Sequence, residues 1–355
     1  MRQRYSKKEA INRILRSLEG EPPASDAPET LVGDLLSEDE AVSDIAELLL
    51  GSLPNESGIL PAGIRNRPSV YGDSKEFFVI PDHPSASDSN TGENPAQPLS
   101  TIQQAVTNCR AYRGDVIWVT SSDSWQYGAG SETGVVENVT IPATKPGISI
   151  IGVGRGSLGT YWQPVIEGSG SFCLVINALD VTVDGFCFWS SGGEGNGIFC
   201  NWSGPPYGEN SVIANCTFTD DLNIGIQMEY AWFIDIYNNK FQECNTYGIF
   251  VDPLGSGIEY ERIFGNWFND CGVTMQLGDC SRTLIYNNYI YQVNAQATGS
   301  CTNLGILTAS GTYNQIFNNY FGMPLAAWDA FNSSAATDAW VNNHCMDGPN
   351  TTNPA

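Results

Sequence analysis

The pattern of apolar and polar positions between residues 148 and 345 repeats a six-residue phrase. The phrase begins with an apolar residue, carries Asn or Gly near its middle, and ends with Phe or another apolar residue. Its copies start 22 to 31 residues apart: Val183–Phe188, Ile213–Phe218, Ile236–Phe241, Ile263–Phe268, Ile285–Ile290, Ile316–Phe321 and Trp340–Cys345. A second phrase, in phase with the first, places Gly before an alternating apolar strand, at Gly197, Gly225, Gly248, Gly272 and Gly305. Two short strands per period predict an all-β solenoid over residues 78–345.

Each period is one coil that cannot bury its inward side chains alone, so we expect successive coils to stack about 4.8 Å apart. The inward residues then form columns. One column is Ile213, Ile236, Ile263, Ile285 and Ile316, and another is Phe218, Phe241, Phe268, Ile290 and Phe321. A column of Asn at one tight bend, where Asn tolerates the left-handed conformation, predicts a structural ladder. Its members are Asn239, Asn266, Asn288, Asn319 and Asn343.

The first 77 residues have a different pattern. Apolar residues at helical spacing predict two short amphipathic helices within residues 1–54, interpreted as a docking anchor, and residues 55–77 are interpreted as a linker. Such short helices cannot build a core of their own, so we expect them to dock on the solenoid or, preferably, on another protein. The docking residues are Ile11, Ile14, Leu15, Leu18, Val42, Ile45, Leu48 and Leu49. Residues 346–355 have little to bury and are predicted to form a flexible tail or a partner contact.

The segments Pro98–Val106, Gly114–Val119 and Gly147–Gly152, followed by the repeats, resemble the right-handed parallel β-helix superfamily. This pectate-lyase-like fold is shared by polysaccharide lyases, hydrolases and phage tailspikes, and the resemblance implies a short helix capping the first coil. Separately, Glu9–Leu15 with Gly20–Pro23 is similar to the start of tail-tube adaptor proteins of short-tailed phages. The fold alone does not determine the function.

Composition narrows the choice of partners. Hydrophobic residues make up 41% and charged residues 15% of the 355 residues, so the chain can build a core. The formal net charge of −23 argues against nucleic acid and anionic membranes as partners. No run approaches the roughly 20 apolar residues of a membrane span, and Met1–Lys8 lacks the apolar core of a signal peptide, so we expect synthesis in the host cytoplasm and no membrane insertion. The ten cysteines form no Cys-x-x-Cys pair and are expected to be buried thiols.

The residue sets that the resemblance implies for pectate lyases and polygalacturonases are not matched by this sequence. Aligning the strands that begin with Gly instead places Glu229 and Asp252 on adjacent rungs, about 5 Å apart. This spacing is near the separation of the two catalytic carboxylates in a retaining glycosidase. Glu229 and Asp252 are the candidate catalytic pair. In the same alignment Thr274 and Gln276 lie beside Phe250 and Asp252. The candidate carbohydrate-binding residues around the pair are Gln227, Tyr230, Trp232, Tyr260 and Gln276.

No cofactor or metal site is predicted, although loop acids could bind a divalent cation such as calcium. These acids are Glu259, Glu261, Asp270 and Asp279.

Three interpretations of the whole protein remain open. The favoured one is a structural spike or fibre of a phage or phage-like particle, facing outward on the virion, docked on other virion proteins by its helices and binding host-surface polysaccharide. The resemblance to tailspikes further implies a homotrimer, which would cover the outward residues Phe264, Trp267, Tyr289, Phe317 and Tyr320. The alternatives are a polysaccharide-degrading hydrolase or lyase, and a bacterial surface adhesin.

Overall fold

A computed structural model describes most of the solenoid. The described residues are 73–120, 135–153, 163–190, 195–201, 208–219, 221–229, 231–252, 258–278, 280–291, 304–308, 312–322, 338–345 and 348–350. The chain divides into two units, Met1–Pro61 and Ala62–Ala355, and everything below concerns the second. The predicted anchor helices, with all eight docking residues, lie outside the described residues.

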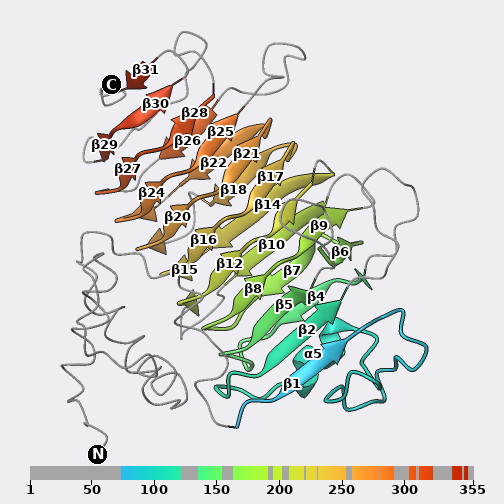
Figure 1. Ribbon diagram of the computed structural model, residues 1–355. Helices are drawn as coiled ribbons and strands as arrows, with labels where there is room; N and C mark the ends of the chain where they lie inside the picture. The colour runs from blue at the N-terminus through green and yellow to red at the C-terminus, as the bar shows by residue number, and fades with distance from the viewer. Residues whose placement is uncertain are drawn as a thin grey trace, which may run out of the picture. The chain divides into compact units, whose positions relative to one another are not determined.

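The second unit is the predicted parallel β-helix, built from four sheets (Figure 1). We name them A to D in the order in which a central coil passes through them. All strand pairs in the described part of the chain are parallel except the last, because successive coils add their strands to each sheet in the same direction. Figure 1 shows the rungs stacking from β1 to β29. No described helix is long and apolar enough to span a membrane.

Sheets A and B have ten strands each. The strands of sheet A are β1 (Glu76–Val79), β2 (Val116–Thr120), β5 (Ser149–Val153), β8 (Thr182–Asp184), β12 (Val212–Ala214), β16 (Asp235–Tyr237), β20 (Arg262–Phe264), β24 (Leu284–Tyr286), β27 (Gln315–Phe317) and β29 (Ala339–Val341). Those of sheet B are β3 (Val135–Val136), β6 (Val165–Gly168), β9 (Cys187–Ser190), β13 (Thr217–Phe218), β17 (Lys240–Gln242), β21 (Trp267–Asn269), β25 (Tyr289–Tyr291), β28 (Tyr320–Phe321), β30 (Asn343–Cys345) and β31 (Gly348–Asn350).

Sheets C and D are smaller, with seven and four strands. The strands of sheet C are β4 (Val139–Ile141), β7 (Phe172–Ile176), β10 (Gly195–Asn201), β14 (Leu222–Glu229), β18 (Tyr247–Val251), β22 (Val273–Leu277) and β26 (Leu304–Thr308). Those of sheet D are β11 (Gly208–Glu209), β15 (Ala231–Trp232), β19 (Ile258–Glu259) and β23 (Cys280–Ser281).

The two predicted apolar columns form the core. The Ile column aligns residue by residue across β12, β16, β20, β24 and β27, and every member is inaccessible to solvent. The second column aligns across sheet B and is equally buried, with parallel rings of Phe218, Phe241 and Phe268 at centroid distances of 4.7 and 4.5 Å. The eight cysteines whose side chains are described form no disulfide with one another and are buried, as the sequence predicts.

The asparagine ladder is continuous from Asn239 to Asn343. Each side-chain amide donates to a backbone carbonyl of the Ile column at 2.9–3.0 Å, and each one before Asn343 also donates to the side-chain oxygen of the next ladder residue at 3.0–3.1 Å. The prediction of the left-handed conformation for these residues is wrong by one position. It belongs to the preceding residue, such as Asn238 with φ 55°, which turns the chain so that the next side chain points inward.

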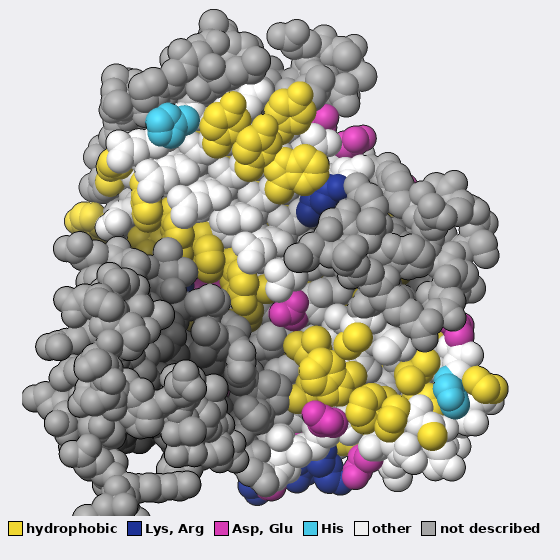
Figure 2. Space-filling model, viewed as in Figure 1, with side chains coloured by type: hydrophobic (Ala, Val, Ile, Leu, Met, Phe, Trp, Pro, Cys, Tyr) yellow, Lys and Arg dark blue, Asp and Glu magenta, His cyan; other side chains and the backbone are white. Residues whose placement is uncertain are grey.

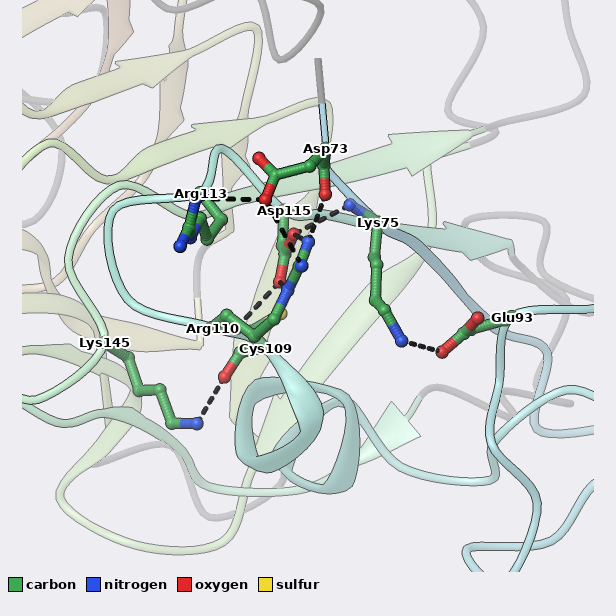
Figure 3. A network of polar contacts seen from close by, with 8 residues as sticks. All are labelled: Asp73, Lys75, Glu93, Cys109, Arg110, Arg113, Asp115 and Lys145. Carbon is green, nitrogen blue, oxygen red and sulfur yellow. Dashed lines mark hydrogen bonds and ion pairs between the residues drawn. The ribbon is translucent and has the colours of Figure 1, made fainter. Parts of the chain in front are cut away.

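A short helix and a charged network close the first coil. Helix α5 (Ile102–Asn108) buries Ile102, Ala105 and Val106 against the solenoid. Beside it, the inaccessible carboxylate of Asp115 accepts hydrogen bonds from the Arg110 guanidinium and from the backbone N–H groups of Lys75 and Arg110 (Figure 3). Burial raises the pKa of Asp115, but these hydrogen bonds outweigh it and the pKa is lowered. The network therefore ties the start of β1 to the end of the cap.

Three boundaries or registers differ from the sequence predictions. Strand β1 begins at Glu76, inside the predicted linker, and β31 pairs antiparallel with β30, inside the predicted tail, where it covers an otherwise open strand edge. In β22, Thr274 rather than Gly272 aligns with Gly248, because Met275 pairs with Ile249. Gly272 lies in the turn before β22, where an added Cβ would lie 2.5 Å from the backbone oxygen of Asn245.

Candidate functional site

A column of left-handed residues runs along the turn before sheet A. Its members are Asp180, Asn210, Phe233, Tyr260, Arg282 and Tyr313, with φ between 53° and 68°. Bulky side chains rarely adopt this conformation, and such strain persists only where the surrounding structure holds it. Here backbone hydrogen bonds between coils hold it: the N–H of Phe233 donates to Glu259, that of Tyr260 to Ser281 and that of Arg282 to Thr312. Strained residues of this kind point to a functional surface.

The same six residues line a groove of about 700 Å³. The other side of its lining comes from outward positions of sheet A, namely Asp235, Arg262, Leu284 and Gln315. Asp180 lies at one end of the column, where burial raises its carboxyl pKa while a hydrogen bond from Asn210 opposes the rise. The groove thus combines aromatic, cationic, acidic and amide side chains.

The aromatic rings of the groove stack on one another along the solenoid. Phe233 and Tyr260 are nearly parallel, with centroids 5.0 Å apart and an interplanar angle of 5°. The guanidinium of Arg282 lies over the Tyr260 ring, 5.3 Å from its centroid. Both faces of Tyr260 are therefore occupied, and its edge and hydroxyl meet solvent. Tyr260 therefore offers a ligand its ring edge rather than a ring face.

Two ion pairs flank this stack and differ in burial. Two N–H groups of the Arg262 guanidinium donate to the carboxylate of Asp235, one of them at 2.6 Å. The Arg262 side chain is 20% exposed and that of Asp235 is 5% exposed. Arg282 contacts Glu259 at 2.6 Å, and these side chains are 47% and 35% exposed. The first pair is part of the sheet, whereas the second lies at the surface.

A buried polar column lies just beneath the groove, and its first three members directly follow Tyr260, Arg282 and Tyr313 in the chain. Glu261, Thr283, Asn314 and Asp338 are almost or wholly inaccessible. The Thr283 hydroxyl donates to Glu261 at 2.8 Å, and the backbone N–H of Thr283 donates to the Asn314 side chain. Burial raises the pKa of Glu261 to about 8. This residue was grouped with the loop acids that could bind a cation, but it points into the solenoid.

The structure places the candidate catalytic pair on adjacent rungs of sheet C. Glu229 ends β14, and Asp252 follows β18, with its backbone N–H donating to the carbonyl of Met228. Both side chains are half-buried, and the Gln227 amide donates to Glu229 at 3.3 Å. Gln276 lies in register with Gln227 and Phe250 rather than with Asp252, because of the β22 register described above.

The predicted aromatic residues are divided between two places. Trp232 is half-buried in sheet D, in register with Glu259, and Tyr260 lies in the groove. Tyr230 and Asp279 lie outside the described residues. The pair Glu229 and Asp252 is not part of the groove lining.

Sequence reasoning missed Phe233, Arg282 and Tyr313. A signal was available, because each lies three positions before an Ile of the first column, as Tyr260 does. The position was not recognised because its residues share no chemical type. What they share is the left-handed backbone, which becomes visible only in three dimensions.

Comparisons with known proteins found one family model and several solved structures similar to parts of this chain. Residues 166–303 match the family described as "Periplasmic copper-binding protein (NosD)". Within the described part of the chain, no three His, Cys, Asp or Glu side chains gather as metal ligands do. No curated protein matches the sequence.

Several solved structures resemble the chain at low identity. An alginate lyase from Paenibacillus sp. is 14% identical, with 69% of this chain and 94% of that one covered and a TM-score of 0.33. A GH136 lacto-N-biosidase from Eubacterium ramulus is 12% identical, with 96% and 71% covered and a TM-score of 0.44. The Dettilon tailspike protein is 15% identical, with 74% and 68% covered and a TM-score of 0.33. Similarities this weak say nothing about the function of this chain.

Proposed function

We propose that this chain is a glycan-binding spike or fibre subunit of a phage or phage-like particle. In this proposal the groove contacts a host-surface polysaccharide, the N-terminal helices dock on other virion proteins, and the solenoids associate as a homotrimer. The observation that carries the glycan-binding part is the column of residues with left-handed backbone that lines the groove. The helical pattern of residues 1–54, distinct from that of the solenoid, supports the docking part.

The groove has the dimensions and chemistry that an extended glycan needs. Its six left-handed residues lie on successive coils, so the column extends about 24 Å at roughly 4.8 Å per coil. Hydroxyl, amide, carboxylate and guanidinium groups supply hydrogen bonds, and aromatic edges supply apolar contact. Rigid strands on both sides hold these groups in place, so little ordering is required on binding.

Replacing Tyr260 tests this proposal. We expect Tyr260→Ala to weaken binding of the full chain to its target polysaccharide at least tenfold, because the central ring of the stack is removed. Affinity electrophoresis against purified bacterial surface polysaccharides measures this. Tyr112→Ala is the matched control, since Tyr112 is also left-handed and 59% exposed but lies outside the groove lining. Equal binding by both variants and the unmodified chain would contradict the proposal.

A polysaccharide-degrading activity is the second candidate function. The observation that favours it is that Glu229 and Asp252 lie on adjacent rungs, because two neighbouring carboxyl groups can act as acid and nucleophile. In this scheme Gln227 orients Glu229 through its hydrogen bond.

Substituting the pair tests the activity. If the chain cleaves a glycan, Glu229→Gln with Asp252→Asn should abolish the release of reducing ends while leaving glycan binding in place. The control is Asp221→Asn, since Asp221 accepts a hydrogen bond from the Trp189 indole on another part of the solenoid. Full cleavage by the double variant would exclude this pair as catalytic.

A further inference from the structure

Positive charge is scarce in the second half of the solenoid and gathers in the groove. Residues 161–355 contain 18 Asp and Glu but only three Lys and Arg, namely Lys240, Arg262 and Arg282. Two of these three line the groove. In so acidic a chain, a groove that holds most of the local cations is a candidate for binding an anionic group.

The two arginines differ in how firmly they are held. Arg262 is fixed by two hydrogen bonds to the nearly inaccessible Asp235 carboxylate. Arg282 has a partly exposed partner, Glu259, and exposed ion pairs contribute little to stability. Arg282 can therefore exchange Glu259 for another anion at little cost, whereas Arg262 cannot.

The stack around Tyr260 also favours a negatively charged ligand. Because Phe233 and the Arg282 guanidinium cover the two faces of this ring, its edge is the part that a ligand meets. Ring edges carry the positive end of the aromatic quadrupole. The carboxylate of Asp180 opposes an anion, but it lies four coils from Arg282, roughly 19 Å at 4.8 Å per coil, and screening weakens its effect beyond about 8 Å.

We propose that the groove selects a glycan bearing carboxylate or sulfate groups, and that Arg282 leaves Glu259 to contact one of them. This inference rests on the proposed glycan binding. It extends the glycan-binding proposal in two ways. The ligand is negatively charged, and the contact that Arg282 makes is exchangeable, because Glu259 and the bound anion compete for the same guanidinium.

The test compares acidic polymers with their neutral counterparts. The full chain is titrated with polygalacturonate, alginate, hyaluronan and acidic bacterial capsular polysaccharides, each beside its carboxyl-reduced form, together with dextran sulfate beside dextran. We expect at least tenfold tighter binding to an acidic form, weakening as salt rises from 50 to 300 mM. Arg282→Gln should lose this preference, and Arg282→Lys should keep part of it. Glu259→Gln should bind the acidic form several-fold more tightly, because it removes the competing carboxylate.

The control variant is Arg113→Gln. Arg113 also forms an exposed ion pair, with Asp73 at 3.0 Å, but it lies at the capped end of the solenoid. Binding to neutral forms alone, lost in Tyr260→Ala, would overturn the anionic inference and leave the glycan proposal standing. Weaker acidic binding by Glu259→Gln would also overturn the inference. Absence of binding to every acidic and neutral polymer would overturn both.

Discussion

At the scale of single residues, the buried carboxyl of Glu261 makes the solenoid sensitive to pH. One oxygen accepts the Thr283 hydroxyl and the other, also buried, has no hydrogen-bond partner among the described residues. The folded protein holds this proton until about pH 8, whereas the unfolded chain releases it near 4.5. Stability from this group is therefore full below about pH 4.5 and is lost as pH rises to 8, at about 1.4 kcal/mol per unit of pKa difference.

Glu261→Gln tests this linkage, since it keeps the size of the side chain and removes the ionisation. We expect the free energy of unfolding of the unmodified chain to fall relative to that of the variant between pH 5 and 8, by a few kcal/mol. Denaturant titrations at pH 5, 6, 7 and 8 measure the difference. Glu259→Gln serves as the control, because Glu259 is accessible to water. A constant difference across this range would contradict the raised pKa of Glu261.

At the scale of elements, the asparagine ladder is the feature that sequence predicts best. In the copies of the six-residue phrase that contain a ladder Asn, this Asn is the fourth residue, and in most of them the first residue is an Ile of the buried column. The structure aligns both the Ile column and the Asn ladder. Strand order follows because each coil must stack on the previous one. The register of β22 was less predictable, because Gly272 serves a turn whereas Gly225 and Gly248 serve a strand. Identical residues had different physical roles, which a one-dimensional alignment cannot separate.

Asn266 tests the energetic value of the ladder. Its side chain makes buried hydrogen bonds to Asn239, Asn288 and the carbonyl of Ile236. We expect Asn266→Ala to lower the free energy of unfolding by roughly 2–4 kcal/mol, because several buried polar groups lose their partners. Asn238→Gly is the control: it removes an exposed side chain and suits the left-handed backbone. If thermal or denaturant unfolding showed equal losses for both variants, the ladder would contribute nothing specific.

At the scale of the whole molecule, the apolar outward residues lie on two neighbouring faces. On sheet B, Trp267, Tyr289 and Tyr320 are 37–40% exposed, and Figure 2 shows hydrophobic side chains gathered on the surface. On sheet A, Phe264 and Phe317 belong to a stack with Tyr286 at 5.0 Å spacings. A closed ring of three copies needs two different patches, one on each side of a subunit, and these two faces could supply them.

The molar mass in solution tests this assembly. We expect size-exclusion chromatography with light scattering to give a molar mass three times the 38.5 kDa of one chain. Trp267→Glu with Tyr289→Glu should shift it to the monomer, because two charges would have to be buried in the interface. Tyr112→Glu, at a more exposed site at the capped end, should leave the trimer intact. A monomer at every concentration would refute the trimer, whereas glycan binding would remain testable through the groove alone.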